Sequence, residues 1–148
     1  MIIKMWNHSD LHSLLGVVEI PLHALILVVD DDVLERMGAS AMFSDAGYRV
    51  LEAADADEAL QFLEENAAIR LIFTDVSMPG SMSGADLARQ VAHRWPSVGI
   101  IMTSGRPRPE KLPLSMRFHD KPYAPTAVLR HAKEMTNPLG RAGYSLQS

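Results

Sequence analysis

Residues 71–80, which read LIFTDVSMPG, predict a buried strand that ends in an acid. Apolar and β-branched residues run into Asp75, and a loop with Pro79 and Gly80 follows at once. Asp75 should therefore lie at the carboxyl end of the strand. A carboxylate there is well placed for chemistry, because open α/β sheets bind ligands outside the carboxyl ends of their strands. An aspartate that only caps a turn is the alternative.

Three further apolar segments end in the same way, and each delivers polar side chains. They are residues 25–29 before Asp30, Asp31 and Asp32, residues 100–102 before Thr103, and residues 116–120 before Lys121. If these segments are parallel strands, the acids, the hydroxyl and the ammonium group emerge at one edge of one sheet. Packing alone does not explain four strand ends with this set of side chains.

The first predicted helix spans residues 33–46. Val33, Met37, Ala41 and Met42 recur at helical spacing, and we assign Met37 to the core. Asp32 stands directly before this helix and is expected to cap it.

Later helices have recognisable starts. Asp55 and Glu58 have capping-box spacing, Ser83 can cap the following helix, and Pro125 suits a first helical position. We assign Trp95, near the end of the helix after Ser83, to the core. With a further strand at 49–53, five strands alternate with four or five helices. The predicted fold class is α/β, a doubly wound five-stranded parallel sheet with helices on both faces.

Composition suits one globular domain with extensions. The chain has 148 residues, of which 47% are hydrophobic, and we expect an N-terminal extension at 1–23, a domain at 24–136 and a flexible tail at 137–148. The formal net charge of -4 argues against direct binding of nucleic acid. No apolar run is long enough for a membrane span. The absence of cysteine is compatible with a cytoplasmic location.

The first 23 residues allow a second interpretation. Leu11, Leu14, Leu15 and Val18 have helical spacing, which permits a short amphipathic helix instead of a solvated extension.

The predicted acid cluster requires a cation. Asp30, Asp31 and Asp75 would meet at adjacent strand ends, and two like charges about 4 Å apart repel by roughly 4 kcal/mol at an effective dielectric near 20. Oxygen ligands favour Mg²⁺, with Ca²⁺ less suited because no cage of six to eight oxygens is visible. Carboxylates with a hydroxyl and a lysine suit phosphoryl transfer, in which one carboxylate attacks.

These motifs resemble the receiver domain of two-component response regulators, which has the flavodoxin-like fold, over about residues 24–136. The matching residues are Asp30 and Asp31, Asp75 before Met78-Pro79-Gly80, Thr103, and Lys121-Pro122. The resemblance implies that Asp75 accepts a phosphoryl group from a sensor histidine kinase or a phosphotransfer protein.

Further roles follow from the same resemblance. Asp31 and Asp75 would bind Mg²⁺ directly and Asp30 through water, with the main-chain carbonyl of Ser77 as a further ligand. Thr103 and Lys121 would hold the phosphoryl oxygens. A cis peptide would precede Pro122, and Phe118 would be the aromatic switch residue.

The chain departs from the family pattern in the short, proline-rich span between Thr103 and Lys121. This span resembles single-domain receivers that act through protein contacts. We therefore expect a phosphoacceptor, not a turnover enzyme, with a downstream protein target, no membrane partner and a possible homodimer.

Two alternatives remain at this point. A phosphatase of the haloacid dehalogenase type would use Asp30 as its nucleophile together with Asp32, and would leave Asp75 unexplained. The other alternative is a receiver-like binding module that is never phosphorylated.

Overall fold

The computed structural model describes residues 24–80, 82–105 and 116–137. The elements follow one another along the chain as β1 (Leu25–Val29), α2 (Val33–Asp45), β2 (Arg49–Ala53), α3 (Ala56–Glu65), β3 (Ile69–Asp75), α4 (Gly84–Arg94), β4 (Gly99–Ser104), β5 (Met116–Asp120) and α5 (Pro125–Thr136). Strands and helices alternate from β1 to β4. The irregular crossover expected before β5 lies outside the described residues.

The strands form one parallel sheet in the order β2-β1-β3-β4-β5. β1 pairs with β2 on one side and with β3 on the other, so the chain reverses its direction across the sheet at β1. The crevice at such a reversal, outside the carboxyl ends of the strands, is where open α/β sheets bind ligands. The predicted doubly wound five-stranded parallel sheet is confirmed.

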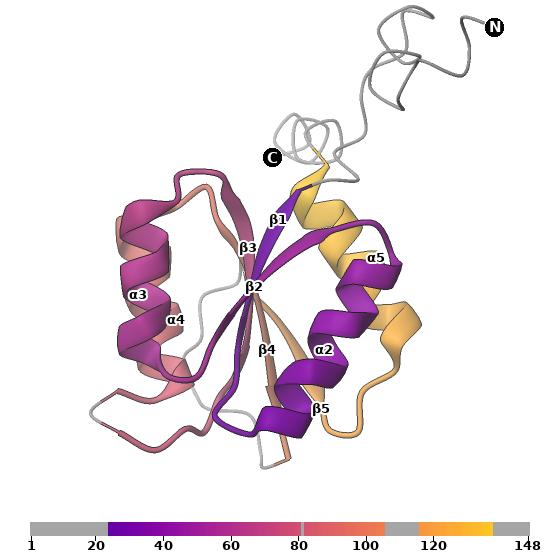
Figure 1. Cartoon of the computed structure of the whole chain (residues 1–148), viewed down its shortest axis with the longest axis horizontal. Coiled ribbons are helices and arrows are strands. Elements are labelled where there is room, and N and C mark those ends of the chain that lie inside the picture. Colours follow the sequence, from indigo (N-terminus) through magenta and orange to yellow (C-terminus); the bar gives the residue numbers. More distant parts are fainter. Residues whose placement is uncertain (1–23, 81, 106–115, 138–148) are drawn as a thin grey trace, which may run out of the picture.

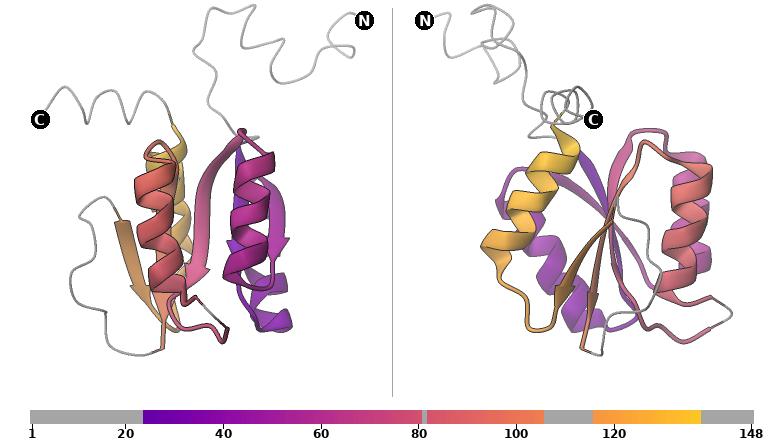
Figure 2. Two further views of the ribbon diagram at one scale, coloured as in Figure 1. Left: turned by 90° about the vertical axis from the view of Figure 1, so that its left-hand side faces the viewer. Right: turned by 180° about the vertical axis from the view of Figure 1, so that it is seen from behind.

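Helices cover both faces of this sheet. Figure 1 and Figure 2 show α3 and α4 on one face and α2 and α5 on the other. The first face packs around Leu63, Leu87 and Val91, and the second packs around Phe43 and Val128. The inner strands β1, β3 and β4 are buried between these layers, which explains their nearly continuous apolar sequences.

The helices begin at the capping residues that the sequence predicts. Asp32 accepts a hydrogen bond from the main-chain N–H of Glu35 and caps α2, and Ser83 caps α4 with a full capping box. Asp55 caps α3 by accepting from the Glu58 N–H. The Glu58 carboxylate accepts from the N–H of residue 54 instead of residue 55, so the reciprocal half of that box is shifted by one residue. α5 begins at Pro125.

The predicted apolar stripe of α2 is wrong at Val33, Met37 and Ala41, which are exposed, whereas Met42 packs against the core. Val33 and Met37 are 54% and 56% exposed, whereas Ala39, Ser40 and Phe43 are the buried residues of this helix. Phe43 sets the orientation, because it makes edge-to-face contacts with Tyr48 and Phe73 in the core of the α2/α5 face.

Several expectations lie outside the described residues. They concern the alternative helix within residues 1–23 and the tail after residue 137, so the domain limits remain predictions. Among the described helices, none has both the length and the apolar character that a membrane span requires.

Candidate functional site

The carboxyl edge of the sheet carries the side chains that the strand pattern predicts there. Asp30 directly follows β1, and Asp75 is the last residue of β3. Thr103 pairs with Asp75 in the parallel register of β3 and β4, and Lys121 directly follows β5. Segments far apart in the sequence therefore deliver two acids, a hydroxyl and an ammonium group to one edge.

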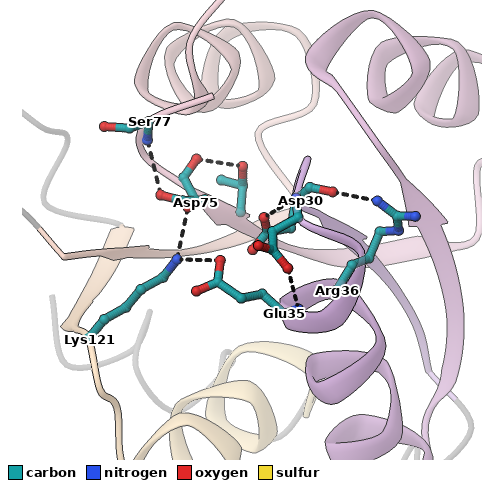
Figure 3. A network of polar contacts seen from close by, with 8 residues as sticks. Asp30, Glu35, Arg36, Asp75, Ser77 and Lys121 are labelled. Carbon is teal, nitrogen blue, oxygen red and sulfur yellow. Dashed lines mark hydrogen bonds and ion pairs between the residues drawn. The ribbon is translucent and has the colours of Figure 1, made fainter. Parts of the chain in front are cut away.

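Lys121 connects this edge to helix α2. Its Nζ donates hydrogen bonds to Asp75 Oδ2 at 2.8 Å and to Glu35 Oε2 at 3.0 Å, as Figure 3 shows. Burial alone would lower the pKa of Lys121, but the hydrogen bonds and charges of Asp75 and Glu35 outweigh burial and raise that pKa. The main-chain N–H of Lys121 donates to the Ser104 carbonyl at 2.8 Å. The peptide bond to Pro122 is cis, as the resemblance implies.

Asp30 is a buried acid, with 8% of its surface exposed. Burial raises the pKa of Asp30 to about 6, and the charges of Glu35 and Asp75 act in the same direction. The N–H of Asp32, which donates to Asp30 Oδ1 at 2.9 Å, and the charge of Lys121 offset only part of this rise. An acid in this position is stabilised as a carboxylate by any additional cation nearby.

Arg36 fixes the main chain of Asp30. Its Nη1 donates to the Asp30 carbonyl at 2.8 Å, and its Nε pairs with Glu52 Oε1 at 3.1 Å. Sequence reasoning identified neither Arg36 nor Glu35 as part of the site. The available signal is their place in the first turn of the helix that directly follows the three aspartates, because that turn lies beside the sheet edge.

The Asp75 carboxylate is held from two directions. Its Oδ1 accepts from the main-chain N–H of Ser77 at 3.1 Å, and its Oδ2 faces Lys121. Behind it, the first residue of α4 packs on the main chain: a Cβ at Gly84 would overlap the carbonyl oxygen of Asp75. Glycine is required there for the close approach of α4 to β3, a second feature that sequence reasoning did not identify.

Three acids lie within reach of one metal ion. One carboxylate oxygen from each of Asp30, Glu35 and Asp75 lies within 4.8 Å of the others. Their hard oxygen donors fit Mg²⁺. The exposed Asp31 is not part of this group, so its role as a direct ligand stays a prediction, as does that of the Ser77 carbonyl.

A cleft of about 500 Å³ opens beside these acids. Its lining combines the charged edge with the apolar side of α2 and the segment that follows β5. The lining residues are Asp30, Glu35, Gly38, Ala39, Phe73, Thr103, Lys121, Pro122 and Tyr123. An anionic group in this cleft would meet Lys121, whose ammonium lies 2.8 Å from Asp75 Oδ2.

The sequence matches the family model of the response regulator receiver domain over residues 26–116. Among curated proteins, it is 32% identical over 118 residues to the sensor kinase CckA of Brucella abortus, covering 76% of this chain and 12% of that protein. It is 28% identical over 126 residues to the hydrogenase transcriptional regulatory protein HoxA of Cupriavidus necator, covering 81% of this chain and 26% of that protein. The chain thus spans far less than two thirds of these two relatives.

Solved structures agree with the family match. The receiver domain of the hybrid histidine kinase CckA is 31% identical, with a TM-score of 0.66 and coverage of 76% of this chain and 99% of that chain. A CheY-like receiver domain protein from Methanospirillum hungatei is 28% identical, with a TM-score of 0.69 and coverage of 76% of this chain and 92% of that chain.

Receiver domains are signalling phosphoacceptors of two-component systems, not turnover enzymes. They interact with histidine kinases or phosphotransfer proteins and generally bind Mg²⁺ at an acidic cluster. The family match includes β1 to β4 and the acids at their carboxyl ends. This chain belongs to the family of response regulator receiver domains.

Proposed function

We propose that Asp75 is the residue that accepts the phosphoryl group. The observation that carries this proposal is the 2.8 Å contact between Asp75 Oδ2 and Lys121 Nζ at the carboxyl edge of the sheet. The Asp75 side chain is 13% exposed, so it is largely buried but still accessible from solvent. Thr103 and Asp30 line the adjoining cleft.

In the proposed reaction, a carboxylate oxygen of Asp75 attacks the phosphorus of a phosphohistidine on a sensor histidine kinase or phosphotransfer protein. The new P–O bond forms as the P–N bond breaks, and the electron pair of that bond stays on the imidazole nitrogen. The product is an acyl phosphate on Asp75. The Lys121 ammonium and the Thr103 hydroxyl bind oxygens of the transferred group and stabilise its charge.

Mg²⁺ would be held directly by Asp31, Asp75 and the main-chain carbonyl of Ser77, and by Asp30 through water. The geometry that supports Asp30 and Asp75 in this assignment is their place, with Glu35, in the group of carboxylate oxygens within 4.8 Å of one another. When bound, Mg²⁺ supplies positive charge that neutralises the phosphoryl oxygens. Arg36 keeps Asp30 oriented through its main chain, and the Ser77 N–H does the same for the Asp75 carboxylate.

The response to phosphorylation remains a prediction. We expect the Thr103 hydroxyl to move toward the phosphoryl group and Phe118 to fill the vacated space, which shifts a pre-existing equilibrium. Thr103 is buried, and Phe118 packs partly against the core of the α3/α4 face. A downstream protein target, a homodimer and a cytoplasmic location are also predictions.

No observation favours the two alternatives. In a haloacid dehalogenase scheme Asp32 would take part in catalysis, but its carboxylate accepts the Glu35 N–H at 3.0 Å and caps α2. A binding module that is never phosphorylated does not require Lys121 beside Asp75. The dehalogenase-type alternative predicts that Asp75 is dispensable for phosphate incorporation, whereas the binding-module alternative predicts that the wild-type protein incorporates none.

Labelling by acetyl phosphate tests the proposal. In the presence of Mg²⁺, the wild-type protein is expected to incorporate phosphate, and Asp75→Asn is expected to incorporate none. Asp57→Asn is the matched control, because Asp57 is an exposed acid in the first turn of α3. Equal labelling of Asp75→Asn and wild type would refute the assignment.

A further inference from the structure

Glu35 places a second carboxylate, besides that of Asp75, against the lysine of the site. Its Oε2 lies 3.0 Å from Lys121 Nζ, the same nitrogen that lies 2.8 Å from Asp75 Oδ2. Its side chain is 48% exposed, whereas that of Lys121 is 21% exposed. Two carboxylates thus share one ammonium, and the outer one belongs to the first turn of α2 (Figure 3).

A phosphoryl group on Asp75 would change this arrangement. It adds negative charge and acceptor oxygens at the position that Lys121 serves. The Glu35 oxygen that faces Asp30 and Asp75 lies within 4.8 Å of theirs, a distance at which like charges repel appreciably unless a cation lies between them. Glu35 therefore competes with the phosphoryl group for the ammonium and repels it directly.

Lys121 does not depend on Glu35 for its position. Its main-chain N–H is bonded to the Ser104 carbonyl at 2.8 Å, and its ammonium is bonded to Asp75. Glu35, in contrast, has a half-exposed side chain, which can rotate into solvent at little cost. The contact between them is therefore more easily lost than the contact between Lys121 and Asp75.

We propose that Glu35 is a residue that tunes phosphorylation by holding Lys121 in the unphosphorylated protein and opposing the arrival of the phosphoryl group. This inference rests on the proposed function of Asp75. Glu35 favours the unphosphorylated form, and it adds negative charge that strengthens the attraction of the site for Mg²⁺. The opposite role, a supporting contact that positions Lys121 for phosphate, predicts effects of the opposite sign.

The test is the affinity for beryllofluoride, a phosphoryl mimic, measured by calorimetric titration at saturating Mg²⁺. Glu35→Gln is expected to bind beryllofluoride about 3- to 10-fold more tightly than wild type, because one partly screened repulsive charge is removed. Glu35→Ala must shift in the same direction, since alanine has no amide that could itself contact the mimic. The same variants should bind Mg²⁺ alone about 2- to 5-fold more weakly.

Glu64→Gln is the matched control. Glu64 is also an exposed carboxylate in an ion pair, with Arg94 at 2.8 Å, and it belongs to α3 instead of the site. Its substitution should leave both affinities within about two-fold of wild type. Melting temperatures without ligand verify that all variants are folded.

The outcomes separate the two proposals. Unchanged or weaker beryllofluoride binding by Glu35→Gln and Glu35→Ala, with normal binding by wild type, would overturn the role of Glu35 alone. Failure of the wild-type protein to bind beryllofluoride with Mg²⁺ would overturn the proposed function of Asp75, and the role of Glu35 with it.

Discussion

Helices α4 and α2 both begin beside the site, but they are built differently. α4 starts with a complete capping box and buries Leu87, Ala88 and Val91. α2 begins directly after the acids and leaves Val33, Leu34 and Met37 exposed at its start. The difference indicates that α4 stabilises the carboxyl edge of the sheet, whereas the first half of α2 contributes charged groups and open surface to it.

A matched pair of leucine substitutions gives the largest contrast between these helices. Leu87→Ala removes a fully buried side chain from α4 and should lower the free energy of unfolding by about 2–5 kcal/mol. Leu34→Ala removes a side chain that is 80% exposed on α2 and should change the free energy of unfolding by no more than about 0.5 kcal/mol. Denaturant titration of both variants measures the two values. Similar losses would show that α2 stabilises the domain as much as α4 does.

Glycine substitutions sharpen the same comparison with a smaller effect. Gly84→Ala would force a methyl group into the carbonyl of Asp75 and should cost about 1–3 kcal/mol of stability. Gly38→Ala, inside α2, meets no atom within 4 Å and should gain about 0.5–1 kcal/mol from higher helix propensity. Thermal unfolding of the two variants is the measurement. A stable Gly84→Ala protein would contradict the close approach of α4 to β3.

The sequence predicts these helices unequally well, for a physical reason. In α4 the apolar residues lie on one face, so the spacing of Leu87 and Val91 identifies the buried side. In α2 apolar residues occur all around the helix, and spacing alone does not distinguish the stripe with Met37 from the one with Phe43. Contacts of Phe43 with the sheet decide the orientation, and they depend on the tertiary fold.

The functional site, like the two helices, could be predicted from the sequence only in part. Strand ends identify Asp30, Asp75, Thr103 and Lys121, because their place follows from the alternation of strands and loops. The part played by Glu35 depends on how α2 rotates beside the sheet. The periodicity of the apolar residues in α2 does not determine that rotation.

A charge substitution at Asp30 tests the acid cluster beside α2. The folded-state pKa of Asp30 is about 6, above its ordinary value of 3.8, so ionisation of this acid destabilises the folded protein increasingly as the pH rises from about 4 through 6. Asp30→Asn keeps an oxygen that can accept the Asp32 N–H and removes the charge near Glu35 and Asp75. In metal-free buffer at pH 8 it should be more stable than wild type by about 1 kcal/mol, after screening by solvent.

The pH dependence of this difference is its diagnostic feature. The gain should shrink as the pH falls below 6 and become small near pH 4, where Asp30 is protonated in the folded wild type and partly protonated in the unfolded chain. Thermal unfolding of both proteins across pH 4–8 measures it. A gain that does not vary with pH would contradict the buried, raised-pKa state of Asp30.

The carboxyl edge of the sheet is expected to direct a phosphoryl group onto Asp75. The most direct measurement is mass spectrometry of the wild-type protein after reaction with acetyl phosphate and Mg²⁺, with the acid-labile phosphate assigned to a residue. A single acyl phosphate on Asp75 is the expected result. Phosphate on Asp30, or on any residue away from this edge, would contradict it.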